Sequence, residues 1–276
     1  MTYLQFDFDI DSAEQSNKLV ALLAIQGFDG FEEQENKLVA FIAEDRFNEP
    51  EFATVIDRFE AISYTQSVIE NINWNKKWEE DFKPVLVENF VGIRASFHEP
   101  IHDVEHEIII TPKMSFGTGH HATTYLVMNQ MKELVFLKKR VLDFGTGTGV
   151  LAILASKLGA EKVLAIDYDE WSITNAKENI VQNNCANISV VQADHIDLNQ
   201  KFDIVLANIN LNVIVSSMPA ISAVAISGGV ILLSGFLKEN EKVIITSLKA
   251  AGLQYQATGQ RGDWLIIMAN KPLTAK

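Results

Sequence analysis

A short glycine-rich stretch of the sequence is flanked by two acidic residues. Residues 143–149 read DFGTGTG, in which Asp143 precedes three alternating glycines, and Asp167 follows the apolar run KVLAI further along the chain. Alternating glycines permit a tight turn and let a ligand approach the backbone closely. A carboxylate at this spacing can accept hydrogen bonds from both hydroxyl groups of a ribose. The pattern therefore predicts a site for a cofactor that contains adenosine.

Asp143 distinguishes between the cofactors that contain adenosine. In a nicotinamide dinucleotide site the glycine loop faces a pyrophosphate, and a carboxylate at about 4 Å would repel each phosphate charge by roughly 4 kcal/mol at an effective dielectric constant near 20. S-adenosylmethionine has no phosphate, and its ammonium and sulfonium groups would be attracted by the acid. The GxGxG spacing also differs from the GxGxxG of dinucleotide sites. A nicotinamide-dependent oxidoreductase stays as the alternative, and Asp143 could instead be an acid that the dipole of the following helix favours.

The elements that must position these residues alternate between strands and helices from residue 137 onward. Compact apolar runs that end in polar residues are RVLDF, KVLAID, ISVVQAD and FDIVLAN. Such runs are typical of parallel strands that helices bury on both faces. Two later strand signals, LQYQATG and DWLIIMA, predict an antiparallel hairpin at the C-terminal end. We therefore expect an α/β domain with a doubly wound sheet over residues 110–276, and a ligand at the carboxyl ends of its strands.

The first 72 residues carry a different pattern of shorter elements. Helical patterns at 12–25 and 50–61 lie among four strand signals, so the predicted order is β-α-β-β-α-β, as in small α+β domains of the ferredoxin-like type. Residues 73–109 show no comparable repeat and are predicted to be a linker. The expected divisions of the chain are therefore 1–72, 73–109 and 110–276.

Composition limits the class of protein and the class of partner. The 276 residues are 47% hydrophobic, without a secretory leader pattern or an apolar run long enough to cross a bilayer, so we expect a cytoplasmic protein without membrane contact. The net charge of −13 argues against direct nucleic-acid binding, which draws on clustered lysine and arginine. Residues 1–60 hold 14 acidic and 4 basic residues, a net charge of −10 that suits a basic partner or serves solubility alone.

The sequence resembles one methyltransferase family over essentially its whole length. LDFGTGTGVLAI and AIDYD are similar to motifs I and II of class I methyltransferases. MSFGTGHHATT at 114–124, ANIN at 207–210 and WNKKWEEDFKP at 74–84 resemble the bacterial ribosomal protein L11 methyltransferases, the PrmA family. The resemblance implies the class I methyltransferase fold, S-adenosylmethionine as cofactor, and lysine side chains and the N-terminal amine of a large-subunit ribosomal protein as methyl acceptors. Another basic protein is the alternative substrate, and we expect a monomer.

The resemblance and the strand-end pattern together give the candidate site residues. The resemblance implies a cofactor site at Thr124, Gly145, Asp167 and Asn208, and the strand-end pattern adds Asp143, Gly147 and Asp194. Phe116 and Asn208 are the candidate catalytic residues. Two glycines within residues 116–124 predict a flap, in which Thr123 or Thr124 would cap the helix that follows. No metal site is expected, because the adjacent His120 and His121 lack further ligands at suitable spacing.

Asn208 is the candidate that bears on the chemistry of the acceptor amine. Methyl transfer is an in-line displacement at a sulfonium carbon, so the protein mainly aligns the reactants and excludes water. A lysine amine, with a pKa near 10.4, must first lose its proton. The carbonyl of Asn208 can orient the neutral amine, whereas a carboxylate there would favour the ammonium form. The alternative is that Asn208 only caps the next helix. Asn210 replaces the leucine that is usual in the family, and the effect of Asn210 and Asn212 on the acceptor site is left open.

Overall fold

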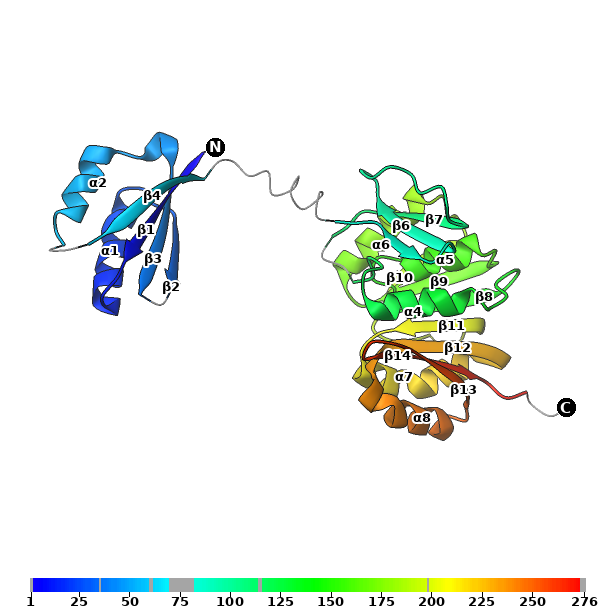
Figure 1. Cartoon of the computed structure of the whole chain (residues 1–276). Coiled ribbons are helices and arrows are strands. Elements are labelled where there is room, and N and C mark those ends of the chain that lie inside the picture. Colours follow the sequence, from blue (N-terminus) through cyan, green and yellow to red (C-terminus); the bar gives the residue numbers. More distant parts are fainter. Residues whose placement is uncertain are drawn as a thin grey trace. The chain divides into compact units, whose positions relative to one another are not determined.

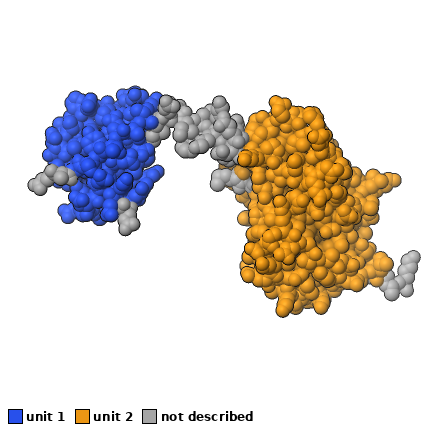
Figure 2. Space-filling model, viewed as in Figure 1, with its two compact units in different colours: residues 1–81 blue, residues 82–276 orange. Residues whose placement is uncertain are grey.

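The chain forms two compact units. The structure, a computed structural model, describes residues 2–34, 36–59, 62–69, 82–113, 116–197 and 199–273. The division falls between Met1–Asp81 and Phe82–Lys276, and each unit is described by itself (Figure 2). Trp74 and Trp78, which belong to the family-like segment 74–84, lie outside the described residues. Within the described ranges, no helix combines the length and the apolar character needed to cross a membrane.

The first unit is a four-stranded antiparallel sheet with two helices (Figure 1). Its elements are β1 (Tyr3–Asp9), α1 (Ala13–Ile25), β2 (Gly30–Gln34), β3 (Lys37–Ala43), the short 3-10 helix η1 (Glu44–Arg46), α2 (Glu49–Ile56) and β4 (Tyr64–Ile69). The strands lie in the order β2-β3-β1-β4. The order along the chain is β-α-β-β-α-β, as the sequence predicts, and it is the order of the split βαβ motif.

Local sequence explains the elements of the first unit. Leu4, Phe6 and Phe8 alternate along β1 and are buried beneath the helices, because successive strand residues point to opposite faces. Burying each of these side chains contributes about 1.5–3 kcal/mol. Ser12 caps α1 by accepting from the backbone N–H of Gln15, a bond that satisfies one of the free donors of the first turn.

The second unit is built on a seven-stranded sheet with helices on both faces (Figure 1). Its strands are β8 (Arg140–Phe144), β9 (Lys162–Asp167), β10 (Ile188–Gln192), β11 (Phe202–Asn208), β12 (Ala225–Leu237), β13 (Gln254–Arg261) and β14 (Trp264–Asn270). They lie in the order β10-β9-β8-β11-β12-β14-β13. The first five are parallel, and β14 is antiparallel to both of its neighbours. The predicted doubly wound sheet with a C-terminal antiparallel hairpin is confirmed.

The helices of the second unit form two layers. They are α4 (Ala122–Met131), α5 (Val150–Lys157), α6 (Glu170–Gln182), α7 (Leu211–Val224) and α8 (Glu241–Ala250), with a short 3-10 helix η2 (Lys238–Asn240) before α8. Apolar side chains of α4, α5 and α6 share one buried cluster with one face of the sheet, and those of α7 and α8 share the other. The inner strands β8 and β11 are therefore buried on both faces, which explains why their sequences are continuous apolar runs, whereas the edge strands β10 and β13 are largely exposed.

Residues 85–110 differ from the linker predicted over 73–109. They form a three-stranded sheet of β5 (Val85–Val87), β6 (Val91–Ala95) and β7 (His106–Ile110), in the order β5-β6-β7. This sheet belongs to the second unit, in which β7 packs against α5 and α6. Strands this short, with a long connection before β7, give too few alternating positions for the period of a strand to be recognised in the sequence.

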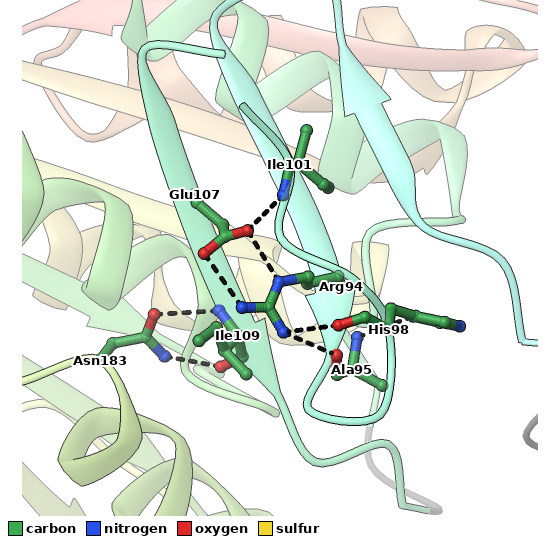
Figure 3. Close-up of polar contacts among 7 residues, drawn as sticks. All are labelled: Arg94, Ala95, His98, Ile101, Glu107, Ile109 and Asn183. Carbon is green, nitrogen blue, oxygen red and sulfur yellow. Dashed lines mark hydrogen bonds and ion pairs between the residues drawn. The ribbon is translucent and has the colours of Figure 1, made fainter. Parts of the chain in front are cut away.

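An ion pair holds the connection between β6 and β7 in place (Figure 3). Arg94 Nε donates to Glu107 Oε1 at 2.7 Å, and Arg94 Nη1 donates to the carbonyl oxygens of Ala95 and His98. Glu107 Oε1 also accepts from the backbone N–H of Ile101 at 2.7 Å. The hydrogen bond from Arg94 is the main cause that lowers the pKa of Glu107. The pair is partly buried and bonded on both sides, so it fixes the loop from which β7 starts.

Candidate functional site

A cavity of about 690 Å³ lies at the carboxyl ends of the parallel strands of the second unit. Gly145 follows β8, Asp167 ends β9, Asp194 follows β10 and Asn208 ends β11, and all four line the cavity. The strand order reverses between β8 and β11, which is the position where doubly wound sheets bind ligands. The structure therefore brings these predicted residues together at the predicted edge of the sheet.

The glycine loop between β8 and α5 is crowded by two other segments of the protein. Gly145 and Gly147 have positive φ angles of 77° and 54°, which side chains rarely adopt. A Cβ atom on Gly145 would overlap the side chain of Ile209, and one on Gly147 would overlap the carbonyl oxygen of Phe116. The glycines therefore allow Ile209 and Phe116, which also line the cavity, to pack against the loop.

Asp167 ties the end of β9 to the glycine loop. Its Oδ2 accepts from the backbone N–H of Gly147 at 2.9 Å, and its Oδ1 accepts from the N–H of Asp169 at 3.1 Å. The side chain is buried but lines the cavity. Each carboxylate oxygen can accept two hydrogen bonds, so both retain capacity for a donor on a ligand. The carboxylate is thus fixed in one orientation before any ligand binds.

Asp143 lies behind the glycine loop rather than in the wall of the cavity. The residue is 0% exposed, and the hydroxyl of Thr146 donates to its Oδ2 at 2.6 Å. Its Oδ1 has no hydrogen-bond partner among the residues that the structure describes. Burial raises the pKa of Asp143 to about 7, against the lowering effect of the bond from Thr146. The direct contact with a ligand ammonium expected from sequence is replaced by a contact with the loop itself, because the chain turns back over the end of β8.

The variant Asp143→Asn should gain more stability at pH 8 than at pH 5. The pKa of Asp143 is raised in the folded state from its ordinary 3.8 to about 7. Stability from this group is therefore fully present below about pH 4 and is lost as the pH rises towards 7. Each pH unit between 5 and 7 costs the wild type about 1.4 kcal/mol, and asparagine does not titrate, so the stability gain of the variant over the wild type should be about 2–3 kcal/mol larger at pH 8 than at pH 5. Urea unfolding at both pH values measures this difference, and an equal gain at both would contradict the assignment.

Asn208 presents an unpaired buried carbonyl at the cavity. Its Nδ2 donates to the hydroxyl of Thr124 at 3.3 Å, and Thr124 itself is fully buried. Among the described residues, its Oδ1 has no hydrogen-bond partner. A buried polar atom left unpaired costs about 1–3 kcal/mol, so this oxygen is suited to accept from a donor on a ligand.

The capping role considered for Asn208 belongs to Asn210. The side chain of Asn210 caps α7 by accepting from the backbone N–H of Val213 at 3.1 Å. Asn212 is exposed on the first turn of the same helix. The residue that departs from the family pattern at 210 therefore has a structural reason, because asparagine is among the best helix N-caps.

The segment 116–124 is joined to the glycine loop at its start. Thr148 donates its backbone N–H to Phe116 O at 2.9 Å and its hydroxyl to Gly117 O at 2.7 Å. The Phe116 side chain is 54% exposed and lines the cavity. Helix α4 is capped by His121, whose Nδ1 accepts from the N–H of Thr123, and not by Thr123 or Thr124 as predicted. The threonines follow the cap and are buried instead.

Two aromatic residues that the sequence did not single out as site residues complete the wall. The ring of His121 lies 5.2 Å from Phe116 and 4.5 Å from Trp264, and all three line the cavity. Burial lowers the pKa of His121, which keeps the ring neutral near pH 7. Sequence reasoning considered His121 only as a metal ligand, and Trp264 lies far away on β14, so no local pattern could have joined them.

The cavity wall carries negative charge without a compensating cation. Its described lining contains Asp167, Asp169 and Asp194 but no lysine or arginine. Asp194 is the exposed member of the three, and its hydrogen bond with His195 at 2.7 Å is the main cause that lowers its pKa. Elsewhere in the described ranges, no cluster of three or more histidine, cysteine or acidic side chains could hold a metal ion. Such a wall opposes a pyrophosphate and suits a ligand with positive charge.

Comparisons with known proteins point to one family. Residues 7–272 match the family described as ribosomal protein L11 methyltransferase (PrmA). The chain is 35% identical over 276 residues to a ribosomal protein L11 methyltransferase of Bacteroides fragilis, covering 97% of this chain and 99% of the relative. It is 37% identical to that of Porphyromonas gingivalis, over 95% and 90% of the two chains. The solved structure of a ribosomal protein L11 methylase from Lactobacillus delbrueckii subsp. bulgaricus is 27% identical, with a TM-score of 0.64 over 69% of this chain and 100% of its own.

Proposed function

The chain belongs to the ribosomal protein L11 methyltransferase (PrmA) family and is an S-adenosylmethionine-dependent methyltransferase, and from this premise we propose that it methylates ribosomal protein L11. The acceptors in this proposal are lysine side chains and the N-terminal amine of that protein, and its place of action is the cytoplasm. The observation that carries the proposal is the cavity: among the described residues, the Asn208 carbonyl is unpaired there, and the wall holds three acids and no lysine or arginine.

The residues of the cavity fit S-adenosylmethionine. When bound, the cofactor supplies a methyl group on a positively charged sulfur. Asp167 would hold the two ribose hydroxyls, because its oxygens are oriented by Gly147 and Asp169 and retain acceptor capacity. The glycine loop would lie beside the methionine part, and Asp194 would lie near the adenine. Asp143 would support the loop from behind through Thr146 rather than contact the cofactor.

The remaining cavity residues act on the acceptor amine. Asn208 accepts a hydrogen bond from the neutral amine through Oδ1, which leaves the nitrogen lone pair free to attack. Its own orientation is set by the bond to Thr124. Phe116, His121 and Trp264 exclude water, and a neutral His121 adds no charge to the site. Loss of water disfavours the ammonium form, so the cavity helps the amine to lose its proton.

Methylation of the purified substrate tests this function. The protein is incubated with purified ribosomal protein L11 and isotopically labelled S-adenosylmethionine, and the product is examined by peptide mass spectrometry. We expect label on lysine side chains and on the N-terminal amine. Label on a different basic ribosomal protein, with none on L11, would replace the substrate by the alternative. Absence of label from all ribosomal proteins would contradict the proposed function.

Replacement of Asp167 by alanine should weaken binding of S-adenosylmethionine by roughly tenfold to a hundredfold. The change removes a charged acceptor for two hydroxyls and releases the N–H of Gly147. Titration calorimetry with the folded variant measures the loss. Asp203→Asn is a matched control, because Asp203 also bonds a backbone N–H, that of Arg140, but lies at the beginning of β11, away from the cavity. Equal affinities of wild type and Asp167→Ala would contradict the ribose assignment.

A further inference from the structure

Two asparagines of α6 and the asparagine at its C-cap bond the backbone of β7 and of Thr111, the residue that follows β7. Asn175, Asn179 and Asn183, here called the asparagine ladder, are 0%, 0% and 8% exposed. Asn183 Oδ1 accepts from Ile109 N at 3.0 Å and its Nδ2 donates to Ile109 O at 2.6 Å, as Figure 3 shows. Asn179 Oδ1 accepts from Thr111 N at 2.7 Å, and Asn175 Nδ2 donates to Thr111 O at 3.0 Å. The ladder thus takes the place of a neighbouring strand.

The spacing of the ladder matches that of a strand. Among the described strands, β7 pairs only with β6, so its other edge presents unpaired backbone groups at alternate residues. Two strand residues span about 6.6 Å, and four helix residues span about 6 Å. Each asparagine amide offers donors and an acceptor, as a peptide group does. Asparagines four apart on a helix can therefore satisfy Ile109 and Thr111 in succession.

Asn179 differs from the other two members of the ladder, because it also bonds the glycine loop. Its Nδ2 donates to the carbonyl oxygen of Thr148 at 2.8 Å, in a fully buried position. The N–H and hydroxyl of the same Thr148 donate to Phe116 O and Gly117 O. One amide therefore joins Thr111, where the chain leaves β7, to Thr148, the loop residue that bonds the start of the segment 116–124.

We propose that Asn179 is a positioning residue for methyl transfer, which holds the Phe116 segment against the glycine loop by bonding Thr111 and Thr148 at once. Asn179 does not itself line the cavity, so it acts through Thr148. A side chain with both bonds has one orientation, and loss of either leaves a buried backbone group unpaired. The bonds of Thr148 thereby keep two cavity residues, Gly147 and Phe116, in fixed positions relative to each other. The inference rests on the proposed use of the cavity as the cofactor site.

The test compares Asn179 of α6 with Asn183, the C-cap of the same helix. Asn179→Ala removes the bonds to Thr111 and Thr148. Asn183→Ala removes two bonds to Ile109 and one to the backbone carbonyl oxygen of Asn179, and it leaves the bond between the Asn179 side chain and Thr148 in place. Both variants should be less stable in urea. Only Asn179→Ala should weaken S-adenosylmethionine binding, by about tenfold, while Asn183→Ala stays within about twofold of the wild type. Should Asn179→Ala fail to fold, Asn179→Ser takes its place, because serine is too short to bond both groups.

Amide exchange and a double-mutant cycle test whether Asn179 acts on the cofactor site through Thr148. The Thr148 N–H should exchange with solvent faster in Asn179→Ala and at the wild-type rate in Asn183→Ala. Thr148→Val removes only the hydroxyl bond to Gly117, so its effect on cofactor affinity should be less than additive with Asn179→Ala and additive with Asn183→Ala. If the two alanine variants bind the cofactor equally well, Asn179 is only a structural residue. If the wild type itself does not bind S-adenosylmethionine, the cofactor site fails before the inference is reached.

Discussion

Replacement of Asn208 by aspartate should lower turnover by roughly a hundredfold, with less than a threefold change in affinity for S-adenosylmethionine. A carboxylate within about 4–6 Å of an amine raises the amine pKa by about 1–3 units, and each unit lowers the reactive neutral fraction tenfold. The side chain keeps its size and an oxygen at the position of Oδ1, so the cofactor should still bind. Steady-state kinetics with ribosomal protein L11, together with titration calorimetry, separate the two effects.

The pH dependence of Asn208→Asp shows whether its lower turnover comes from protonation of the acceptor amine. Raising the pH removes the proton from the acceptor amine, so Asn208→Asp should recover part of its rate at high pH. Asn212→Asp is the control, because it adds the same charge at an exposed position on the next helix. If Asn208→Asp and Asn212→Asp share one turnover number and one pH profile, the carbonyl of Asn208 does not act on the amine.

A chain that begins at Phe82 should keep its cofactor affinity and lose methylation of intact ribosomal protein L11. All described residues that line the cavity belong to the second unit. Residues 1–60 carry a net charge of −10. A ribosomal protein is a basic partner for this acidic surface, because proteins that bind RNA draw on clustered lysine and arginine. Attraction between opposite surfaces mainly raises the association rate, and it is screened over about 8 Å at physiological salt. The same assay as above measures the loss.

Salt and a short substrate give the controls for the shortened chain. Added salt should slow methylation of intact protein by the full chain, and it should have little effect on a short lysine peptide. The shortened chain should still methylate that peptide slowly at high concentration, which shows that its catalytic unit is folded. A folded chain without the first unit that methylates the intact protein at the full rate would assign the acidic charge to solubility alone.

The sequence by itself determined the order of elements in the first unit, the seven-stranded sheet of the second unit and the edge of that sheet that carries the site. Buried parallel strands are continuous apolar runs, so RVLDF, KVLAID and FDIVLAN could be read directly as β8, β9 and β11. The polar residue that ends each run lies at the carboxyl edge, where parallel strands meet. Asp167 and Asn208 were therefore found without any knowledge of their neighbours.

Only the tertiary structure decided which side chains at that edge line the cavity and which are covered by the glycine loop. Asp143 and Asp167 look alike in the sequence, yet the first is covered by the loop and bonded to Thr146, whereas the second lines the cavity. Whether Asn208 or Asn210 caps α7 depends on the point at which the helix begins. Such choices depend on fractions of a turn, which local periodicity does not resolve.

Contacts between residues far apart in the chain could not be predicted from the sequence either. Trp264 contacts His121 only because the order of the strands in the sheet brings β14 close to the start of α4. Asn179 joins Thr111 to Thr148 only because α6 packs between the end of β7 and the glycine loop. The three-stranded sheet from 85 to 110 escaped recognition for the same reason, since strands of three to five residues are defined by their partners rather than by their own pattern. A sequence specifies the period and polarity of each element, whereas long-range packing selects which side chains converge.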